Sequence, residues 1–404
     1  MIFRELLTDE LNNQSEGFKR FAFEQATDLA EYLAKLARLC EKTFTEISTA
    51  LQTVENLGAL PSEELNAAEN FAFSFDQTWA NHEEARKWAF EILQNRTTFA
   101  ADGSQLFLER EVSLPLAAVQ IGWFENPHNE VIGYEKNARF FVLSPEELLK
   151  DQEEPVIPET RVGQKRFEAE VEKATEFLLK KKGWRERGER MPLAFFDGTI
   201  LISFALPRTQ LQEGFINTMV SLVKVSCETG VPLIGYVDRS YARDLLSLLD
   251  TIDGTKTANK RTLDDASILH AASSEVQKTL QKWGDRTVFC YSKRRGLNAF
   301  IDKKTDRSTV GFTYLQTTSD NPPARIDIPA WIYEEGLLNE VLDVVRAECV
   351  IGLGYPYTLE TADQTAVITI RDREIFLQAL QGFAKENNLE FRVSRKAASK
   401  GRRR

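Results

Sequence analysis

Histidine and cysteine are scarce in this chain, with three and four residues among 404. No two cysteines form a CxxC pair, and their wide separation excludes a zinc knuckle, a thioredoxin-type redox motif and a disulfide scaffold. With so few histidines, a catalytic or metal centre built mainly on imidazole is not expected. Any metal site would use carboxylates, which favour a hard cation such as Mg²⁺ or Mn²⁺. The four cysteines are Cys40, Cys227, Cys290 and Cys349.

Long apolar segments are also missing. No uncharged apolar run approaches the roughly 18–20 residues that span a bilayer. Residues 1–14 are charged and lack the apolar stretch of a secretory signal. We therefore expect a cytoplasmic protein with no membrane partner. The 42% apolar and 28% charged residues are typical of a globular chain and exclude one that is disordered throughout.

The net charge of −10 is unevenly distributed. Residues 1–95 carry 17 acidic and 8 basic side chains, whereas the remaining 309 residues carry 44 and 43. The last 13 residues, RVSRKAASKGRRR, hold seven basic groups and no acid. This tail is either a disordered, solubilising end or an arm that contacts nucleic acid.

The length exceeds the roughly 250–300 residues of a single core, so we expect one large domain with an appendage. We predict a helical region over residues 1–95, an α/β domain over 96–390 and a basic, disordered tail over 391–404. Apolar residues from Leu29 to Val54 recur at steps of three, four or seven, which predicts one long helix. Its apolar stripe could bury against the rest of the protein or against a second copy.

Two further helix starts are indicated in the first region. Pro61 followed by Ser-Glu-Glu is a favourable beginning for a helix, and Asn81 is placed to cap another.

From residue 96 the chain becomes rich in β-forming residues. Three segments separated by turn residues predict an antiparallel meander, at Arg96–Gln105, Leu114–Glu125 and Glu130–Leu143. An amphipathic helix over 161–182 and an apolar strand over Met191–Ser203 follow, after which helices and strands alternate. This order predicts an α/β fold with a mixed sheet flanked by helices.

Two acids stand out by their surroundings. Asp102 follows the apolar part of the first strand, and Asp197 lies in or at the end of the strand LAFFDGTILI. A carboxylate in such a strand costs several kcal/mol unless it is paired, hydrogen-bonded or bound to a cation. Each is followed by glycine and a hydroxyl residue, so another backbone or a phosphate can approach closely. Asp-Gly is also a common hairpin turn, and that alternative has more weight for Asp102.

A third acid is expected from the helix between these strands, where Glu168, Glu170 and Glu172 are the choices; each could also be a solvated helix charge. Further candidates in the sequence are Asp238, Asp264, Asp265 and Asp327, of which Asp264 could simply cap a helix. Carboxylates that converge from strands and a helix can form a two-metal site that cleaves phosphodiesters without a histidine or cysteine nucleophile.

Five motifs of this chain resemble, in order and spacing, those of NurA-type nucleases. The resemblance covers about residues 95–390, and the residues before it resemble the insertion-rich N-terminal part of bacterial members. The motifs are ADGSQ at 101–105, FFDGTI at 195–200, VGFTYLQ at 310–316, RIDIPAW at 325–331 and GYPYTLETAD at 354–363.

The resemblance implies an RNase H-like fold and a metal-dependent nuclease, usually favoured by Mn²⁺. Such enzymes resect DNA ends in the 5′→3′ direction and cut single-stranded DNA. They form dimers that dock on a hexameric HerA-type translocase. We therefore expect a role in DNA end processing and double-strand break repair, with single-stranded DNA and duplex ends as substrates.

The resemblance also implies roles for individual residues. Asp102 and Asp197 match the acids of the two Asp-Gly motifs, and Glu170 matches the helical glutamate, an alignment that depends on its spacing from Arg166. Tyr355 matches the tyrosine of the Tyr-Pro motif. Where the family commonly has histidine, this chain has Asp363. An aspartate can bind a hard metal but cannot act as an imidazole base near neutral pH.

Basic residues for a phosphate groove are expected at Lys293, Arg294 and Arg295, beside aromatic residues, although a solvated hairpin is equally compatible. Arg325 either contacts phosphate or pairs with the neighbours of Asp327, which replaces a longer acid of the family.

Two other functions compete with a DNA nuclease. The change to Asp363 would also suit a catalytically degenerate DNA-binding clamp subunit. A metal-dependent hydrolase of RNA or another phosphoester is the third possibility.

Overall fold

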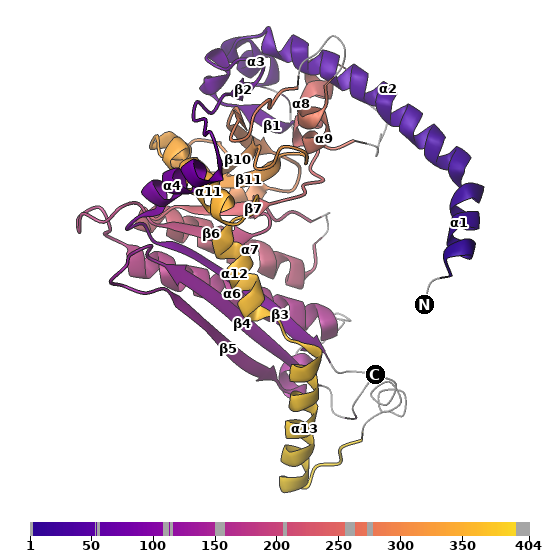
Figure 1. The fold of residues 1–404 in the computed structure, drawn as a ribbon, viewed down its shortest axis with the longest axis vertical. Helices are drawn as coiled ribbons and strands as arrows, with labels where there is room; N and C mark the ends of the chain where they lie inside the picture. Colours follow the sequence, from indigo (N-terminus) through magenta and orange to yellow (C-terminus); the bar gives the residue numbers. More distant parts are fainter. Residues whose placement is uncertain are drawn as a thin grey trace. The chain divides into compact units, whose positions relative to one another are not determined.

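The computed structural model describes residues 3–392 except 53, 55–56, 108–112, 114–115, 150–157, 205–207, 255–262 and 273–277. The chain divides into two compact units, whose helices and strands are labelled in Figure 1. Unit 1 comprises residues 1–78 and 236–333, and unit 2 comprises residues 79–235 and 334–404. The division at residues 95 and 390 stays a prediction, and most of the basic tail lies outside the described residues. Among the described residues, no helix has the length and apolar character to cross a membrane.

Unit 1 is built on an antiparallel sheet with strand order β1-β9-β10-β11, to which β8 adds beside β10 and β2 beside β8. The strands are β1 (Gly58–Pro61), β2 (Ala72–Phe73), β8 (Arg286–Thr287), β9 (Cys290–Lys293), β10 (Val310–Leu315) and β11 (Ala324–Pro329). The helices are α1 (Arg4–Asn13), α2 (Ser15–Cys40), α3 (Phe44–Leu51), η1 (Glu63–Asn66), α8 (Asp244–Ile252), α9 (Asp265–His270), η2 (Asn298–Phe300) and α10 (Ala330–Glu334).

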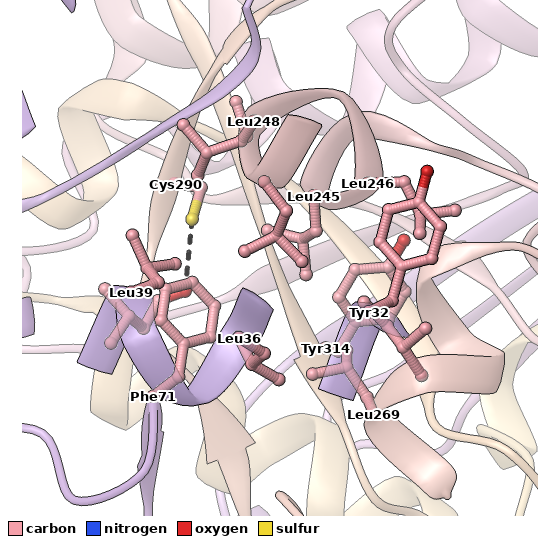
Figure 2. Close-up of a cluster of buried hydrophobic side chains, with 14 of the residues drawn as sticks. Tyr32, Leu36, Leu39, Phe71, Leu245, Leu246, Leu248, Leu269, Cys290 and Tyr314 are labelled. Atoms are coloured by element: carbon pink, nitrogen blue, oxygen red, sulfur yellow. Dashed lines mark hydrogen bonds between the residues drawn. The ribbon is translucent and has the colours of Figure 1, made fainter. Parts of the chain in front are cut away.

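The C-terminal half of α2 is part of the core of unit 1. Tyr32, Leu36 and Leu39 are at most 5% exposed and pack with leucines of α8 and with Tyr314 of β10 (Figure 2). The stripe that begins at Leu29 therefore buries against the chain itself, one of the two alternatives left by the sequence.

The prediction of one long helix from Leu29 to Val54 is wrong. Helix α2 ends at Cys40, and a new helix, α3, begins at Phe44. Thr43 starts α3 with a capping box, because its side chain accepts from Glu46 N–H while its own N–H donates to the Glu46 carboxylate. The spacing of apolar residues continues past Cys40, although the cap at Thr43 interrupts the helix there.

The two other predicted helix starts have different outcomes. At Pro61 a strand ends, and only the 3₁₀ turn η1 follows, where Glu64 binds Arg286 and the backbone N–H of Phe289. Asn81 does cap a helix, since its side chain accepts from Glu84 N–H at the start of α4.

Unit 2 has the strand order β7-β6-β3-β4-β5. Strand β4 is antiparallel to both β3 and β5, whereas β6 runs parallel to β3, so the predicted meander and the predicted mixed sheet are confirmed. The strands are β3 (Thr98–Phe107), β4 (Ala117–Asn126), β5 (Glu135–Leu143), β6 (Leu193–Asp197) and β7 (Leu233–Val237). Of β7, only the residues up to Gly235 belong to unit 2. The helices are α4 (His82–Leu93), α5 (Pro145–Leu149), α6 (Pro158–Lys181), α7 (Gln210–Thr229), α11 (Leu338–Ile351), α12 (Tyr357–Ala366) and α13 (Ile370–Glu386).

Helices α6 and α12 cover opposite faces of β3 and β4. Successive strand residues face opposite sides of a sheet. Gly103 of β3 faces Glu170 of α6, whereas Gly122 of β4 faces Ala366 of α12. Asp102 is directly opposite Gly122 in the β3–β4 register and therefore lies on the α12 side.

Candidate active site in unit 2

Strands β3 and β6 bring the two Asp-Gly motifs together. Ala101 pairs with Phe196 in their parallel register, so the next residues, Asp102 and Asp197, are neighbours at the point where β6 ends. Asp102 is half-buried and Asp197 is exposed. Gly198 stops the strand with a φ of +110°, a value that glycine adopts without steric cost. The hairpin alternative for Asp102 is excluded, because Asp102 lies in the middle of β3.

Gly103 gives helix α6 access to this point. A Cβ atom at position 103 would overlap the Glu170 carboxylate, and it would lie 2.6 Å from Cγ of Arg166 and 2.9 Å from Cδ1 of Ile121. Only glycine leaves room for Glu170 beside the backbone of β3. Arg166 donates from Nη1 to the carbonyl of Gly103 at 3.0 Å, which fixes the same contact.

Of the three glutamates considered in α6, the structure brings Glu170 to the site. Glu170 is 8% exposed and lies between Phe167 and Ala174 on the buried stripe of the helix. Glu168 pairs with Lys165 at 2.8 Å, and Glu172 is largely exposed near Arg139. A charged residue at an apolar position of the helix period was the available sequence signal.

Helix α12 brings Asp363 to the other face of β3. The pKa of Asp102 is raised to about 6 by burial first, and then by the charges of Asp197 and Asp363 and a hydrogen bond with Asp363, although the Gly103 N–H opposes the change. Asp102 and Asp363 are therefore in direct contact. The exposed Asp363 side chain leaves this part of the site open to solvent.

Two clamps hold α12 on the sheet. At its start, the buried Glu348 of α11 accepts from Thr358 N–H at 2.9 Å and from the hydroxyls of Thr358 and Thr98 at 2.8 and 2.9 Å. At its end, Gln120 of β4 donates to the carbonyls of Thr365 and Ala366. Asp363 lies between the two clamps, so they set its position relative to Asp102.

Glu348 and Gln120 were not predicted from the sequence. The only signal in the sequence was the acid in the apolar run VVRAECVIG, which is Glu348.

Tyr355 completes the site. It lies in the loop before α12, and its hydroxyl donates to Oδ1 of Asp197 at 3.1 Å. The loop turns tightly, because Leu353 has a φ of +57° and Gly354 one of +112°. A Cβ at Gly352 would overlap the Tyr355 carbonyl, so this glycine permits the turn.

Burial, and to a smaller extent mutual repulsion, raises the pKa values of two carboxylates of the site. Burial raises the pKa of Glu170 to about 7, and the charges of Asp102 and Asp197 add to the effect. Arg166, whose Nε is 3.5 Å from Oε1 of Glu170, lowers the pKa only in part. Oε1 of Glu170 is buried and accepts no hydrogen bond. The binding of a proton or a cation therefore stabilises this group of acids.

Only oxygen donors are offered here, which suits a hard divalent cation such as Mn²⁺ or Mg²⁺. Among the described residues, no three His, Cys, Asp or Glu side chains converge closely enough to hold a metal ion. The geometry gives the reason, since Glu170 approaches β3 from the α6 face and Asp102 points to the α12 face. The oxygen donors thus suit a divalent metal ion, but the acidic side chains lie too far apart in this structure to bind one together.

The predicted DNA-contacting residues belong to unit 1. Lys293 and Arg294 are partly exposed and Arg295 is exposed, but Arg294 already binds Asp244 at 2.8 Å. Arg325 is 2% exposed and binds Asp327 and Asp244, both at 2.7 Å.

The expectation that Arg325 contacts phosphate is therefore not supported. Of the two alternatives, pairing with acids is the observed one. The same contacts account for Asp327, which lies in unit 1 and is fully buried. The other candidates there, Asp264 and Asp265, bind helix N-termini: Asp264 accepts from Ser267 N–H, and Asp265 accepts from the first N–H groups of α8.

Residues 96–368 match the model of the NurA domain family. A comparison with curated proteins finds no match. A crystal structure of NurA with manganese is 9% identical with a TM-score of 0.38, over 71% of this chain and 89% of that chain. One of NurA bound to dAMP and manganese is 10% identical with a TM-score of 0.34, over 72% and 88%. Endonuclease V from Bacillus subtilis is 12% identical with a TM-score of 0.30, over 78% and 99%.

Proposed function

Because the chain belongs to the NurA domain family, we propose that it is a metal-dependent deoxyribonuclease whose active site is the carboxylate group of unit 2. The observation that carries the proposal is the burial of these acids near one another, which raises the pKa of Asp102 to about 6 and that of Glu170 to about 7. Such perturbed carboxylates are typical of functional sites.

Asp102, Glu170 and Asp197 would hold Mn²⁺ or Mg²⁺, with Asp363 as an auxiliary ligand. A bound divalent cation neutralises the carboxylates, polarises the phosphodiester and lowers the pKa of a nucleophilic water. Tyr355 holds Asp197 by its 3.1 Å hydrogen bond, and its single O–H would have to leave Asp197 to donate to a phosphate oxygen instead. Below its pKa of about 6, Asp102 carries a proton that must leave before this side chain can act as a ligand.

We further propose, from the family resemblance, that the substrates are single-stranded DNA and duplex ends. The enzyme would act as a 5′→3′ exonuclease and single-strand endonuclease in double-strand break repair, as a cytoplasmic homodimer with a HerA-type hexameric translocase. Lys293, Arg294 and Arg295 of unit 1 are proposed contacts for DNA phosphates.

A second candidate is a degenerate DNA-binding clamp subunit of the same complex. Two observations favour it: an aspartate at position 363 in place of histidine, and the separation of the acids on two faces of β3. This subunit would bind DNA or the translocase without cleaving it.

A cleavage assay separates the two candidates. The full chain is incubated with 5′- and 3′-labelled single- and double-stranded DNA, with Mn²⁺, Mg²⁺ or EDTA. The nuclease proposal expects cleavage that requires metal and is lost in Asp197→Asn. Salt-sensitive DNA binding without cleavage under any metal would favour the clamp subunit.

A further inference from the structure

Two neighbouring loops of unit 1 carry an excess of positive charge. Residues 291–309 hold six basic and two acidic side chains, in a chain whose net charge is −10. The first loop follows β9, and the second lies between Ile301 and Ser308, which form an antiparallel bridge. Because salt screens the more distant acids of the chain, this local excess is what an approaching anion meets.

Two contacts hold the loops side by side. Nζ of Lys293, in the first loop, donates to the carbonyl of Asp306, in the second, at 3.1 Å. The guanidinium carbon of Arg307 lies 5.9 Å from the centre of the Tyr291 ring, at the start of the first loop. The cations of both loops therefore belong to one surface.

One of the two acids serves the backbone of its own loop. Oδ1 of Asp302 accepts from the N–H groups of Lys304 and Thr305 at 2.8 and 2.9 Å, and from the Thr305 hydroxyl at 3.2 Å. Hydrogen bonds from the backbone N–H groups of Thr305 and Lys304 lower the pKa of Asp302. This carboxylate thus shapes the loop, and only the exposed Asp306 remains to oppose the cations.

Five of the six basic side chains form no ion pair with an acid in the described part of the chain. The sixth, Arg294, binds Asp244 at 2.8 Å, so its charge is compensated within the protein. Of the five, the first is partly exposed and the other four are exposed: Lys293, Arg295, Lys303, Lys304 and Arg307. We call these five residues the basic surface of unit 1.

The aromatic residues beside the basic surface are not available to stack on a base. Tyr291 is 7% exposed, and Phe300 is 1% exposed. The Tyr291 ring packs edge-on against Phe289, with 5.2 Å between the ring centroids. Within residues 291–309 the surface therefore offers positive charge and N–H donors without an accessible aromatic face, unlike a stacking platform for single strands.

We propose that the basic surface of unit 1 binds the phosphate backbone of DNA by charge, with side chains other than those of the carboxylate site and without preference for base sequence. Lysine and arginine contacts to phosphates position a nucleic acid but do not read its bases. The choice of DNA as the partner rests on the proposed function. The second loop, which the sequence analysis did not single out, supplies three of the five cations.

Binding by charge makes the affinity depend on salt. Each phosphate that a cation neutralises contributes about −0.9 to the slope of log K against log salt concentration for duplex DNA, and about −0.7 for single strands. The variant Lys303→Ala with Lys304→Ala and Arg307→Ala should therefore make the duplex slope less negative by roughly 2–3 and lower the affinity at low salt about tenfold or more.

Fluorescence anisotropy of labelled DNA, with the full chain in EDTA so that no strand is cut, measures both quantities. Duplexes of different base composition should bind equally well. Arg20→Ala with Lys42→Ala and Lys87→Ala is the matched control, because it removes the same number of exposed cations from other parts of the chain and should leave the slope nearly unchanged. All six side chains are exposed, and circular dichroism checks that both variants fold.

Several results would overturn the proposal. These are a loop variant with the affinity and salt slope of the wild type, an equal loss in the control variant, or a strong preference for one base sequence. Loop-dependent binding to anionic phospholipid vesicles without binding to DNA would assign the surface to a membrane instead. Since binding is measured without metal, Asp197→Asn should leave it unchanged, so a failure of the nuclease proposal is distinguishable from a failure of this one.

Discussion

Gly103 allows a carboxylate from a helix to stand against the backbone of a strand. The Glu170 carboxylate occupies the space that a side chain at position 103 would need. Close approach of another chain segment is the physical reason for glycine here, whereas Gly198 is required by its positive φ. The two Asp-Gly motifs therefore use glycine for two different purposes.

Gly103→Ala should displace Glu170 and reduce cleavage strongly, with a loss of about 1–3 kcal/mol in the free energy of unfolding from overpacking. Gly163→Ala, on the same helix as Glu170, is the control, because only Gln105 lies near its Cβ, at 3.9 Å. Cleavage rates and urea unfolding measure both effects. Normal activity in Gly103→Ala would contradict the tight packing described above.

Glu170→Gln should make the metal-free protein more stable at pH 8. The folded-state pKa of Glu170 is about 7, above its ordinary value of 4.5, so the charged form is disfavoured by folding. The destabilisation, about 3 kcal/mol for a shift of this size, is complete above pH 7 and disappears as the pH falls towards 4.5. The gain over wild type in urea unfolding should therefore be large at pH 8 and small at pH 5, and a gain independent of pH would disagree.

At the residue scale, the sequence was informative where an acid interrupts an apolar pattern. This applies to Asp102 and Asp197, which β3 and β6 bring side by side, and to Glu170, which approaches β3 from its other face. It failed for Arg325, because a strand pattern does not reveal that two acids from other segments neutralise a buried arginine.

Among the elements, α12 has the greatest influence on the site. It carries Asp363, and clamps at both ends hold it against β3 and β4. Its N-cap, Pro356, provides no side-chain cap, so Glu348 of a different helix supplies the missing acceptor. The position of Asp363 thus depends on α11 as well as on its own helix.

Glu348→Ala should lower the free energy of unfolding by about 2–4 kcal/mol, since it leaves buried hydroxyls and an N–H without an acceptor. Cleavage should fall even at temperatures where the variant remains folded. Glu360→Ala, an exposed change on α12, serves as the control. Thermal unfolding followed by cleavage assays decides the outcome, and full activity in folded Glu348→Ala would show that α12 needs no clamp.

Element prediction worked where periodicity was strong and local. The β3–β5 meander and α6 follow their patterns closely. Helix α12 was missed because the threonine-rich segment YTLETADQTA has low intrinsic helix propensity and is held by tertiary contacts. The break between α2 and α3 was missed because the prediction used only the spacing of apolar residues, which carries no information about the capping box at Thr43.

For the whole molecule, the composition pointed to carboxylate chemistry. Few histidines and cysteines left acids as the means of binding a cation, and the acids of unit 2 form the candidate site. The sequence could not reveal that residues 1–78 and 236–333 form one compact unit, since such long-range pairing leaves no local pattern.

Mn²⁺ affinity should rise with pH between about 5.5 and 8. Asp102, with a pKa of about 6, and Glu170, with a pKa of about 7, must lose protons to act as ligands. Isothermal titration in buffers of different ionisation enthalpy should show proton release on binding near pH 6.5 and little at pH 8.5. Affinity independent of pH would place the cation elsewhere.

The most direct test of the central claim is the initial rate of Mn²⁺-dependent cleavage of end-labelled DNA by the wild type, Glu170→Gln and Glu172→Gln. The two variants change neighbouring glutamates of one helix, of which only Glu170 reaches the carboxylate site. The account predicts at least about a hundredfold loss for Glu170→Gln, equivalent to roughly 3 kcal/mol, and an unchanged rate for Glu172→Gln. Equal rates for all three proteins, or cleavage by none of them, would contradict it.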